Sequence, residues 1–153
     1  MTERGVVIDA PAEGVYALIA DPMRMADLSP ECVRCRWIGG ADTAVVGARF
    51  RGTSRNGRRR WTTTSTITAV EPGRSFAWEV TYFRRPVARW EYRIEPADHG
   101  VLLTESVIDR RGRVLRRVSP FITGSPDRAA RNGATMESTL TAVRIEAERT
   151  PAT

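Results

Sequence analysis

Alternation of apolar and polar residues predicts a series of β-strands through the middle of the chain. The predicted strands cover residues 31–39, 45–55, 58–70, 75–84, 87–96 and 101–111, after a short first strand at 6–8. Turn-forming pairs such as Asn56-Gly57 and Pro72-Gly73 separate them. Such alternation is typical of antiparallel strands with one buried and one solvated face. We therefore expect one antiparallel sheet of about seven strands.

Helical spacing occurs near both ends of the chain. After Pro11, apolar residues recur on one helical stripe until Pro22 ends it, and a second short helix or turn is expected at 23–28. A longer helix is predicted after Ser125-Pro126-Asp127, with the serine as its cap and the proline just inside. Its apolar stripe consists of Ala129, Gly133, Met136, Leu140, Val143 and Ala147. A helix with one apolar stripe needs an apolar surface, and the concave face of the sheet offers one.

The pair Asn56-Gly57 predicts a tight hairpin. If these two residues form the turn, Ser54 pairs with Arg59, Gly52 with Trp61 and Phe50 with Thr63. Paired residues point to the same side of a sheet. One face then carries Phe50, Gly52, Ser54, Trp61, Thr63, Ser65 and Ile67, and the other carries Arg49, Arg51, Thr53, Arg55, Arg58, Arg60, Thr62 and Thr64.

The first of these faces mixes aromatic side chains with hydroxyl groups. A tightly packed core has little use for hydroxyls, whereas a ligand cavity uses a few polar groups among apolar walls. Each aromatic residue taken alone is equally well explained by core packing. The candidate ligand-binding residues are Trp37, Phe50, Trp61, Thr63, Ser65, Trp78, Tyr82, Trp90, Tyr92 and Met136.

Length and composition favour one soluble domain over residues 1–153. No apolar run approaches a membrane span and no secretory signal precedes the first strand, so we expect a cytoplasmic protein. The net charge is +6, and all 24 basic residues are arginine. The arginines are spread over strands and turns, which favours a solvated face over a nucleic-acid site.

Few residues offer metal or nucleophilic chemistry. Cys32 and Cys35 should point to opposite faces of a regular strand, and they lack the second ligand pair of a zinc site. The only histidine, His99, lies in a predicted turn, and the absence of lysine excludes a Schiff base. We therefore expect no metal and no cofactor.

Glu105 is the candidate catalytic residue. If Ala97–Gly100 form a four-residue loop, Pro96 pairs with Val101 and Tyr92 pairs with Glu105, which puts a carboxyl group on the apolar face. Burial there would raise its pKa and suit it to general acid or base catalysis. A register shift of one residue would instead expose Glu105 to water.

The segment 113–123 carries apolar residues at helical spacing, interrupted by arginines and Pro120. A short connecting helix packed on the body is the favoured interpretation. A lid over a cavity, or a basic amphipathic patch for a membrane surface, are the alternatives.

Several segments together resemble a known family. They are IDAPAEGVYALIADP, LSPECVRCRWIGG, VGARFRG, ITAVEPGRSFAWEV, WEYRIEP and LLTES. Over about residues 4–149 the chain resembles the polyketide cyclase/dehydrase branch of the START-like (SRPBCC) superfamily. The resemblance implies an α+β helix-grip fold, in which a curved antiparallel sheet wraps around a long C-terminal helix and two short helices follow the first strand. It transfers no catalytic residue.

The favoured function is binding of a small, largely apolar ligand, such as a lipid, polyketide or aromatic metabolite, in an internal cavity. One alternative is a cyclase, dehydratase or hydrolase that uses the same cavity, with Glu105 as acid or base and Tyr82 or Tyr92 as hydrogen-bond donor. Another is a basic protein that binds nucleic acid or a partner through the arginine-rich face. The residues leave open whether the protein is an enzyme.

Overall fold

The computed structural model describes residues 1–149 and contains seven strands and four helices over that range. In chain order they are β1 (Thr2–Ile8), α1 (Ala12–Ile19), α2 (Pro22–Leu28), β2 (Cys32–Ile38), β3 (Arg49–Asn56), β4 (Arg59–Glu71), β5 (Ser75–Tyr82), β6 (Arg85–Pro96), β7 (Val101–Asp109), α3 (Arg113–Thr123) and α4 (Arg128–Arg149). The order confirms the predicted helix-grip fold.

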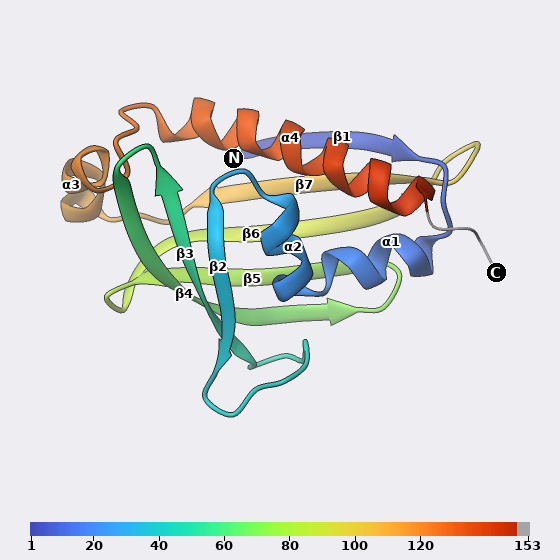
Figure 1. The fold of residues 1–153 in the computed structure, drawn as a ribbon, viewed down its shortest axis with the longest axis horizontal. Coiled ribbons are helices and arrows are strands. Elements are labelled where there is room, and N and C mark those ends of the chain that lie inside the picture. Colours follow the sequence, from blue (N-terminus) through green and yellow to red (C-terminus); the bar gives the residue numbers. More distant parts are fainter. Residues whose placement is uncertain (150–153) are drawn as a thin grey trace.

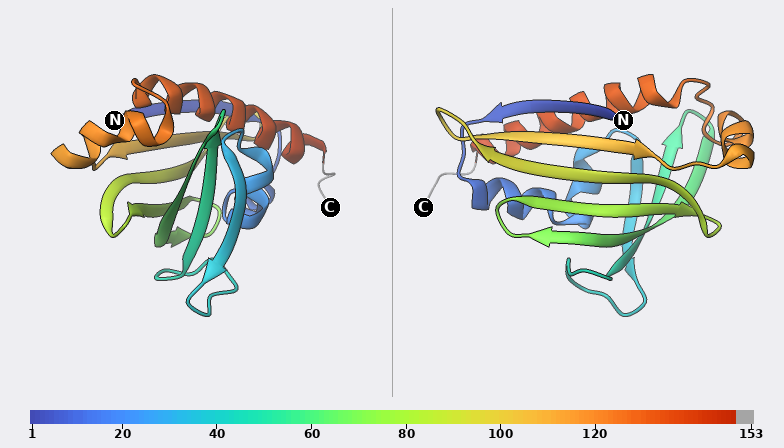
Figure 2. Two further views of the ribbon diagram at one scale, coloured as in Figure 1. Left: turned by 60° about the vertical axis from the view of Figure 1, so that its left-hand side comes forward. Right: turned by 180° about the vertical axis from the view of Figure 1, so that it is seen from behind.

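All neighbouring strands are antiparallel, and the sheet order is β1-β7-β6-β5-β4-β3-β2. The sheet curves around α4, which crosses its concave side, and α1 and α2 close the same side lower down (Figures 1 and 2). Ile8, Val15, Phe76 and Leu103 are fully buried in the core that these layers share. The arrangement leaves α4 and the inner sheet face opposed along their length.

The β3–β4 hairpin has a different register from the predicted one. Asn56 pairs with Arg59, and Gly57 takes a left-handed φ of 63° in the two-residue turn that it forms with Arg58. The side-chain amide of Asn56 donates to the Thr123 carbonyl oxygen at 2.9 Å, which holds Asn56 in the strand end instead of the turn. Each pairing moves by two positions, so Gly52 now faces Thr63. The faces are unchanged, because a shift by an even number preserves the alternation.

Three boundaries also differ from expectation. The first strand begins at Thr2, and β3 begins only at Arg49, because Gly47 has a φ of 91° that breaks the extended segment before it. Helix α4 begins at Arg128, where the Asp127 carboxylate accepts from the Ala130 amide at 3.0 Å. Asp127 therefore caps the helix, in place of the predicted Ser125.

Candidate functional site

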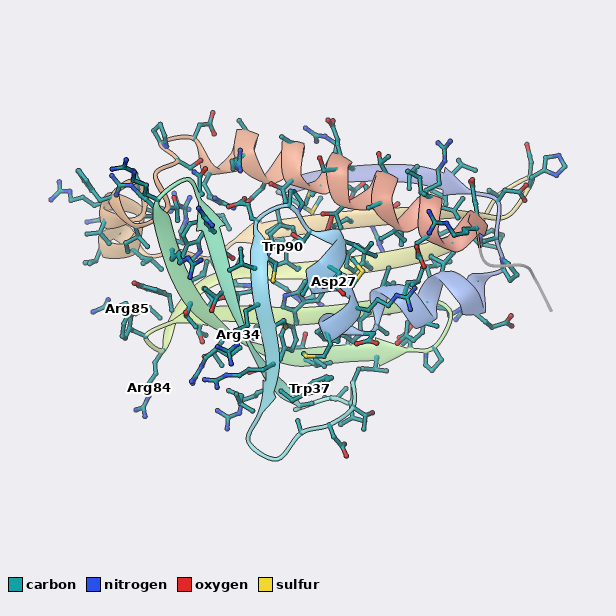
Figure 3. The ribbon with its side chains drawn as sticks, viewed as in Figure 1. Asp27, Arg34, Trp37, Arg84, Arg85 and Trp90 are labelled. Carbon is teal, nitrogen blue, oxygen red and sulfur yellow. The ribbon has the colours of Figure 1, made fainter. Side chains whose placement is uncertain are left out.

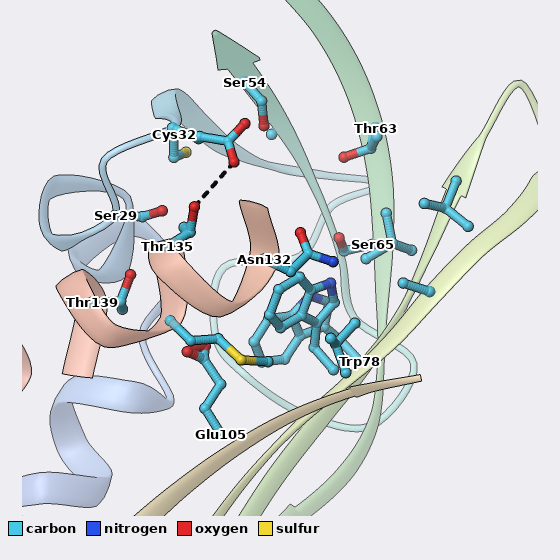
Figure 4. Close-up of a pocket in the computed structure, with 18 of the residues that line it drawn as sticks. Ser29, Cys32, Ser54, Thr63, Ser65, Trp78, Glu105, Asn132, Thr135 and Thr139 are labelled. Carbon is cyan, nitrogen blue, oxygen red and sulfur yellow. Dashed lines mark hydrogen bonds between the residues drawn. The ribbon is translucent and has the colours of Figure 1, made fainter. Parts of the chain in front are cut away.

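A pocket of about 510 Å³ lies between the inner sheet face and α4 (Figure 4). That volume is within the range of small-molecule sites. All seven strands and all four helices of the described chain contribute residues to its walls. Of the predicted residues, the lining includes Phe50, Trp61, Thr63, Ser65, Trp78, Trp90, Tyr92, Glu105 and Met136.

The aromatic wall consists of four residues from three strands: one on β3, one on β5 and two on β6, with β4 lying between β3 and β5. Trp78 on β5 and Trp90 on β6 are directly paired, and their rings are nearly parallel with centroids 6.3 Å apart. Phe50 on β3 lies 6.4 Å from Trp78, and Tyr92 lies 5.7 Å from the same ring. Inward-facing residues of β3, β5 and β6 thus produce one continuous aromatic surface, which reaches across β4.

Two predicted residues lie outside the pocket lining. Trp37 points to the inner face but packs edge-on against Phe50 at the core, with ring centroids 5.9 Å apart. Figure 3 shows Trp37 near the C-terminal end of β2, well separated from Trp90 on β6. Tyr82 lies at the end of β5, where its ring packs edge-on against the ring of Phe83, with centroids 4.6 Å apart. Tyr82 pairs with Arg85 beside the β5–β6 turn, beyond the β-bulge in which Val87 is the extra residue on β6.

Hydroxyl and amide groups line the pocket from both sides. Ser65 and Thr63 face it from the sheet, while Asn132, Thr135 and Thr139 face it from α4. The helix residues were not expected, because the predicted stripe of α4 counted only apolar side chains. Thr135 and Thr139 are one helical turn apart, and each directly precedes a residue of the apolar stripe. This spacing puts both hydroxyl groups at the edge of the stripe and could have indicated that they face the sheet.

Glu105 lies inside the pocket, in the register that the Ala97–Gly100 loop predicts. Pro96 pairs with Val101 and Tyr92 with Glu105. The Glu105 side chain is only 4% exposed, and its Oε1 atom has no hydrogen-bond partner among the described residues. Figure 4 shows it directed into the same space as Trp78 and Ser65.

Burial dominates the acidity of Glu105. Desolvation raises the pKa of the carboxyl group from 4.5 to about 7, and a hydrogen bond with the Tyr92 side chain lowers it in part. The pKa of Tyr92 is raised well above its usual range by its own burial and by Glu105. At neutral pH Glu105 is therefore close to half protonated and can donate or accept a proton.

A charged cluster at one end of the pocket was missed by sequence reasoning. Glu31 is 4% exposed and accepts two hydrogen bonds from the Arg128 guanidinium, at 2.7 and 3.3 Å. Thr135 donates to the same carboxylate at 3.2 Å, and Arg131 lies 3.5 Å from it. The Arg128 guanidinium also lies over the Trp61 ring, 5.7 Å from its centroid. These contacts fasten the start of β2 to the first turns of α4.

The expectation that Cys32 and Cys35 face opposite ways is wrong. Cys32 pairs with Ser54 and Arg34 with Thr53, so Val33 is an extra residue that forms a β-bulge. The bulge shifts the alternation by one, and both thiols line the pocket. Desolvation raises the pKa of Cys35 to about 12, which keeps this thiol protonated and poorly nucleophilic. Both cysteines are free.

Within residues 1–149, no helix is long and apolar enough to cross a membrane, and no group of three or more His, Cys, Asp and Glu side chains is placed to hold a metal ion.

Comparison with solved structures gives close matches to the fold. A polyketide-cyclase-like protein, Cgl2372 from Corynebacterium glutamicum, is 31% identical, with a TM-score of 0.61 over 96% of this chain and 91% of its own. The Zhui aromatase/cyclase from Streptomyces sp. R1128 is 24% identical, with a TM-score of 0.65 over 97% of this chain and 93% of its own. The di-domain aromatase/cyclase StfQ, from the steffimycin biosynthetic pathway, is 13% identical, with a TM-score of 0.74 over 96% of this chain and 50% of its own. The last two matches support the fold alone.

A search of curated proteins gave no match. Residues 2–148 match the family described as polyketide cyclase / dehydrase and lipid transport. That match spans the whole sheet and nearly all of α4. Together with the 31% identical relative, it shows that the chain belongs to the polyketide cyclase / dehydrase and lipid transport family.

Proposed function

We propose that the pocket binds a small, largely apolar ligand, such as a polyketide, lipid or aromatic metabolite. The observation that carries the proposal is the continuous aromatic wall of Phe50, Trp78, Trp90 and Tyr92 facing a row of hydroxyl groups. Burial of apolar ligand surface against such a wall stabilises the complex by about 25 cal/mol per Å². The hydroxyl and amide groups orient the few polar atoms of the ligand.

Gly52 offers a direct test, because it lines the pocket and a Cβ atom added to it meets nothing within 4 Å. Gly52→Leu should place a side chain in the ligand volume and weaken ligand binding by tenfold or more, without loss of stability, since glycine is unfavourable inside a strand. Binding is measured by tryptophan fluorescence against a lipid and polyketide panel, and native mass spectrometry identifies any ligand that co-purifies.

The matched control is Gly14→Leu on α1, where an added Cβ atom also meets nothing within 4 Å and the residue lies outside the pocket lining. It should leave ligand affinity unchanged. Equal affinity of the wild type and both variants for every ligand, or no binding by the wild type, would refute the binding function.

The buried Glu105 favours a second function, a cyclase, dehydratase or hydrolase that acts in the same pocket. Its carboxyl group takes up or releases the proton of the reacting ligand. The Tyr92 hydroxyl, whose hydrogen bond is with Glu105 in the free protein, would turn to donate to the ligand oxygen that gains negative charge. Tyr82, the other donor considered, lies outside the lining. The proton transfer needs a ligand atom beside the unpaired Oε1 of Glu105.

For this second function, Glu105→Gln should lower turnover of a polyketide or ester substrate by about 100-fold or more. Ligand affinity should change little, because glutamine keeps the size of the side chain. Rates are measured from pH 5 to 9, and the wild-type profile should bend near pH 7. Unchanged turnover in the variant would show that Glu105 is not the catalytic group and would leave the binding function standing.

A further inference from the structure

Helix α3 turns part of its apolar side toward solvent. Leu115, Ser119 and Thr123 form its buried side. Val114, Val118 and Phe121 recur one turn apart along the exposed side, and Phe121 is 74% exposed. The apolar side chains of α3 therefore extend beyond the surface on which the helix packs. Two of the three buried positions carry hydroxyl groups instead of apolar side chains. An apolar stripe of this kind requires a partner that the described part of the chain does not supply.

The turn between β5 and β6 lies at the same end of the molecule as α3, below it in every view of Figures 1 and 2. Phe83 and Arg84 form this turn with positive φ values of 48° and 64°. Positive φ at both positions suits Asn-Gly, and it is unfavourable for a phenylalanine followed by an arginine. The turn nevertheless holds Phe83 at its tip, 83% exposed. This second apolar protrusion is independent of the helix.

Arginines surround both protrusions. Arg113 and Arg117 stand on α3, and Arg84 and Arg85 stand at the turn, where Figure 3 shows their side chains pointing away from the molecule. None of the four makes a salt bridge with another described residue, and α3 contains no acidic residue. We call these residues the docking face: Phe83, Arg84, Arg85, Arg113, Val114, Arg117, Val118 and Phe121.

We propose that the docking face binds the surface of an anionic lipid bilayer. The phenylalanine and valine side chains enter the boundary between headgroups and acyl chains, and the arginines bind the lipid phosphates. Guanidinium groups suit phosphate oxygens because they donate paired hydrogen bonds. A protruding turn and a helix side fit a fluid surface, which adapts to them, whereas exposed valines add nothing to binding a nucleic-acid backbone.

Docking also has a consequence for the pocket, and this step rests on the proposed binding function. Ser119 and Thr123, on the buried side of α3, belong to the pocket lining. The same helix would therefore contact the bilayer on one side and the ligand on the other. An apolar ligand would then pass between bilayer and pocket at this end of the molecule.

The test is co-sedimentation of the full chain with vesicles, either phosphatidylglycerol and phosphatidylcholine in equal parts or phosphatidylcholine alone. The wild type should bind the anionic vesicles only, and binding should weaken as salt is added. Phe83→Ser combined with Phe121→Ser should weaken binding about tenfold or more. Arg113→Gln combined with Arg117→Gln should weaken it by roughly 30-fold at low salt.

Arg34→Gln combined with Arg36→Gln on β2 is the matched control, because it removes the same charge from two exposed arginines that also lack a salt bridge with any residue in 1–149. It should change vesicle binding less than threefold. Thermal unfolding of all variants checks that the fold is kept.

Three results would overturn the docking proposal: no vesicle binding by the wild type, equal weakening by both arginine pairs, or full binding after loss of both phenylalanines. Retention on duplex DNA or on an acidic protein, without vesicle binding, would assign the face to that class of partner instead. None of these outcomes bears on Gly52→Leu, so failure of docking and failure of the ligand site are separable.

Discussion

The free energy of unfolding of the wild-type protein should fall by about 2–3 kcal/mol between pH 5 and pH 8. That of the Glu105→Gln variant should not show this decrease. The folded pKa of Glu105 is about 7 and its ordinary value is 4.5. In that interval the folded state holds a proton that the unfolded state has released, so stability falls as the pH rises. Glutamine cannot ionise, and the variant should therefore become the more stable protein at pH 8.

The measurement is urea unfolding of both proteins at pH 5, 6, 7 and 8. Glu95→Gln, at an exposed position on β6, is the control and should follow the wild type at every pH. Asp109 does not interfere, because Arg111 lowers its pKa below 3.8 and its stabilising effect disappears only in stronger acid. Parallel wild-type and Glu105→Gln curves would mean that Glu105 is not buried as a neutral acid.

Arg128→Met should destabilise the protein by about 3 kcal/mol at pH 7. Glu31 is almost completely buried, and the Arg128 guanidinium donates two hydrogen bonds to it, at 2.7 and 3.3 Å. Methionine fills similar space but leaves the carboxylate with Thr135 and with Arg131 at 3.5 Å. Most of the cost comes from the uncompensated charge that remains. Trp61 fluorescence should change as well, since the guanidinium above its ring is lost.

Two further variants isolate the buried pair. Arg144→Met on the same helix breaks an exposed pair with Glu148 and should cost less than about 0.5 kcal/mol. Adding Glu31→Gln to Arg128→Met should restore at least about 1 kcal/mol, because it removes the unpaired charge. Additive effects of the two substitutions, measured by urea unfolding, would show that Glu31 and Arg128 do not act together.

Short-range patterns predicted the inner face of the sheet and left two positions open for Glu105, of which the structure has the buried one. They failed where residues distant in the sequence determine the structure. The hairpin faces survived an incorrect turn because the pairing moved by two positions, and the Asn56 contact that moved it involves Thr123, 67 positions away. A four-residue loop at Ala97–Gly100 was one of two registers that the sequence allowed, and it is the one that places Glu105 opposite Tyr92.

The Glu31 cluster and the bulge at Val33 had no such local signal. Glu31 is separated from Arg128 by 97 positions, and nothing around either residue announces the contact. Val33 is an ordinary strand residue, and only the pairing of β2 with β3 shows that it is extra. A prediction from alternation along one strand assumes that each residue pairs with one residue of the neighbouring strand. At a bulge two residues lie opposite one, so the predicted faces are wrong beyond it.

The extra residue in β2 also bears on how this gene can vary. A point substitution at Val33 changes one exposed side chain. Loss of its codon would remove the bulge, but the residues on either side of it would keep their partners on β3, so Cys32 and Cys35 would both stay on the inner face. Descendants of this sequence should therefore accept many different residues at position 33, and also a one-residue deletion there, whereas a deletion elsewhere in β2 would exchange the two faces of the strand.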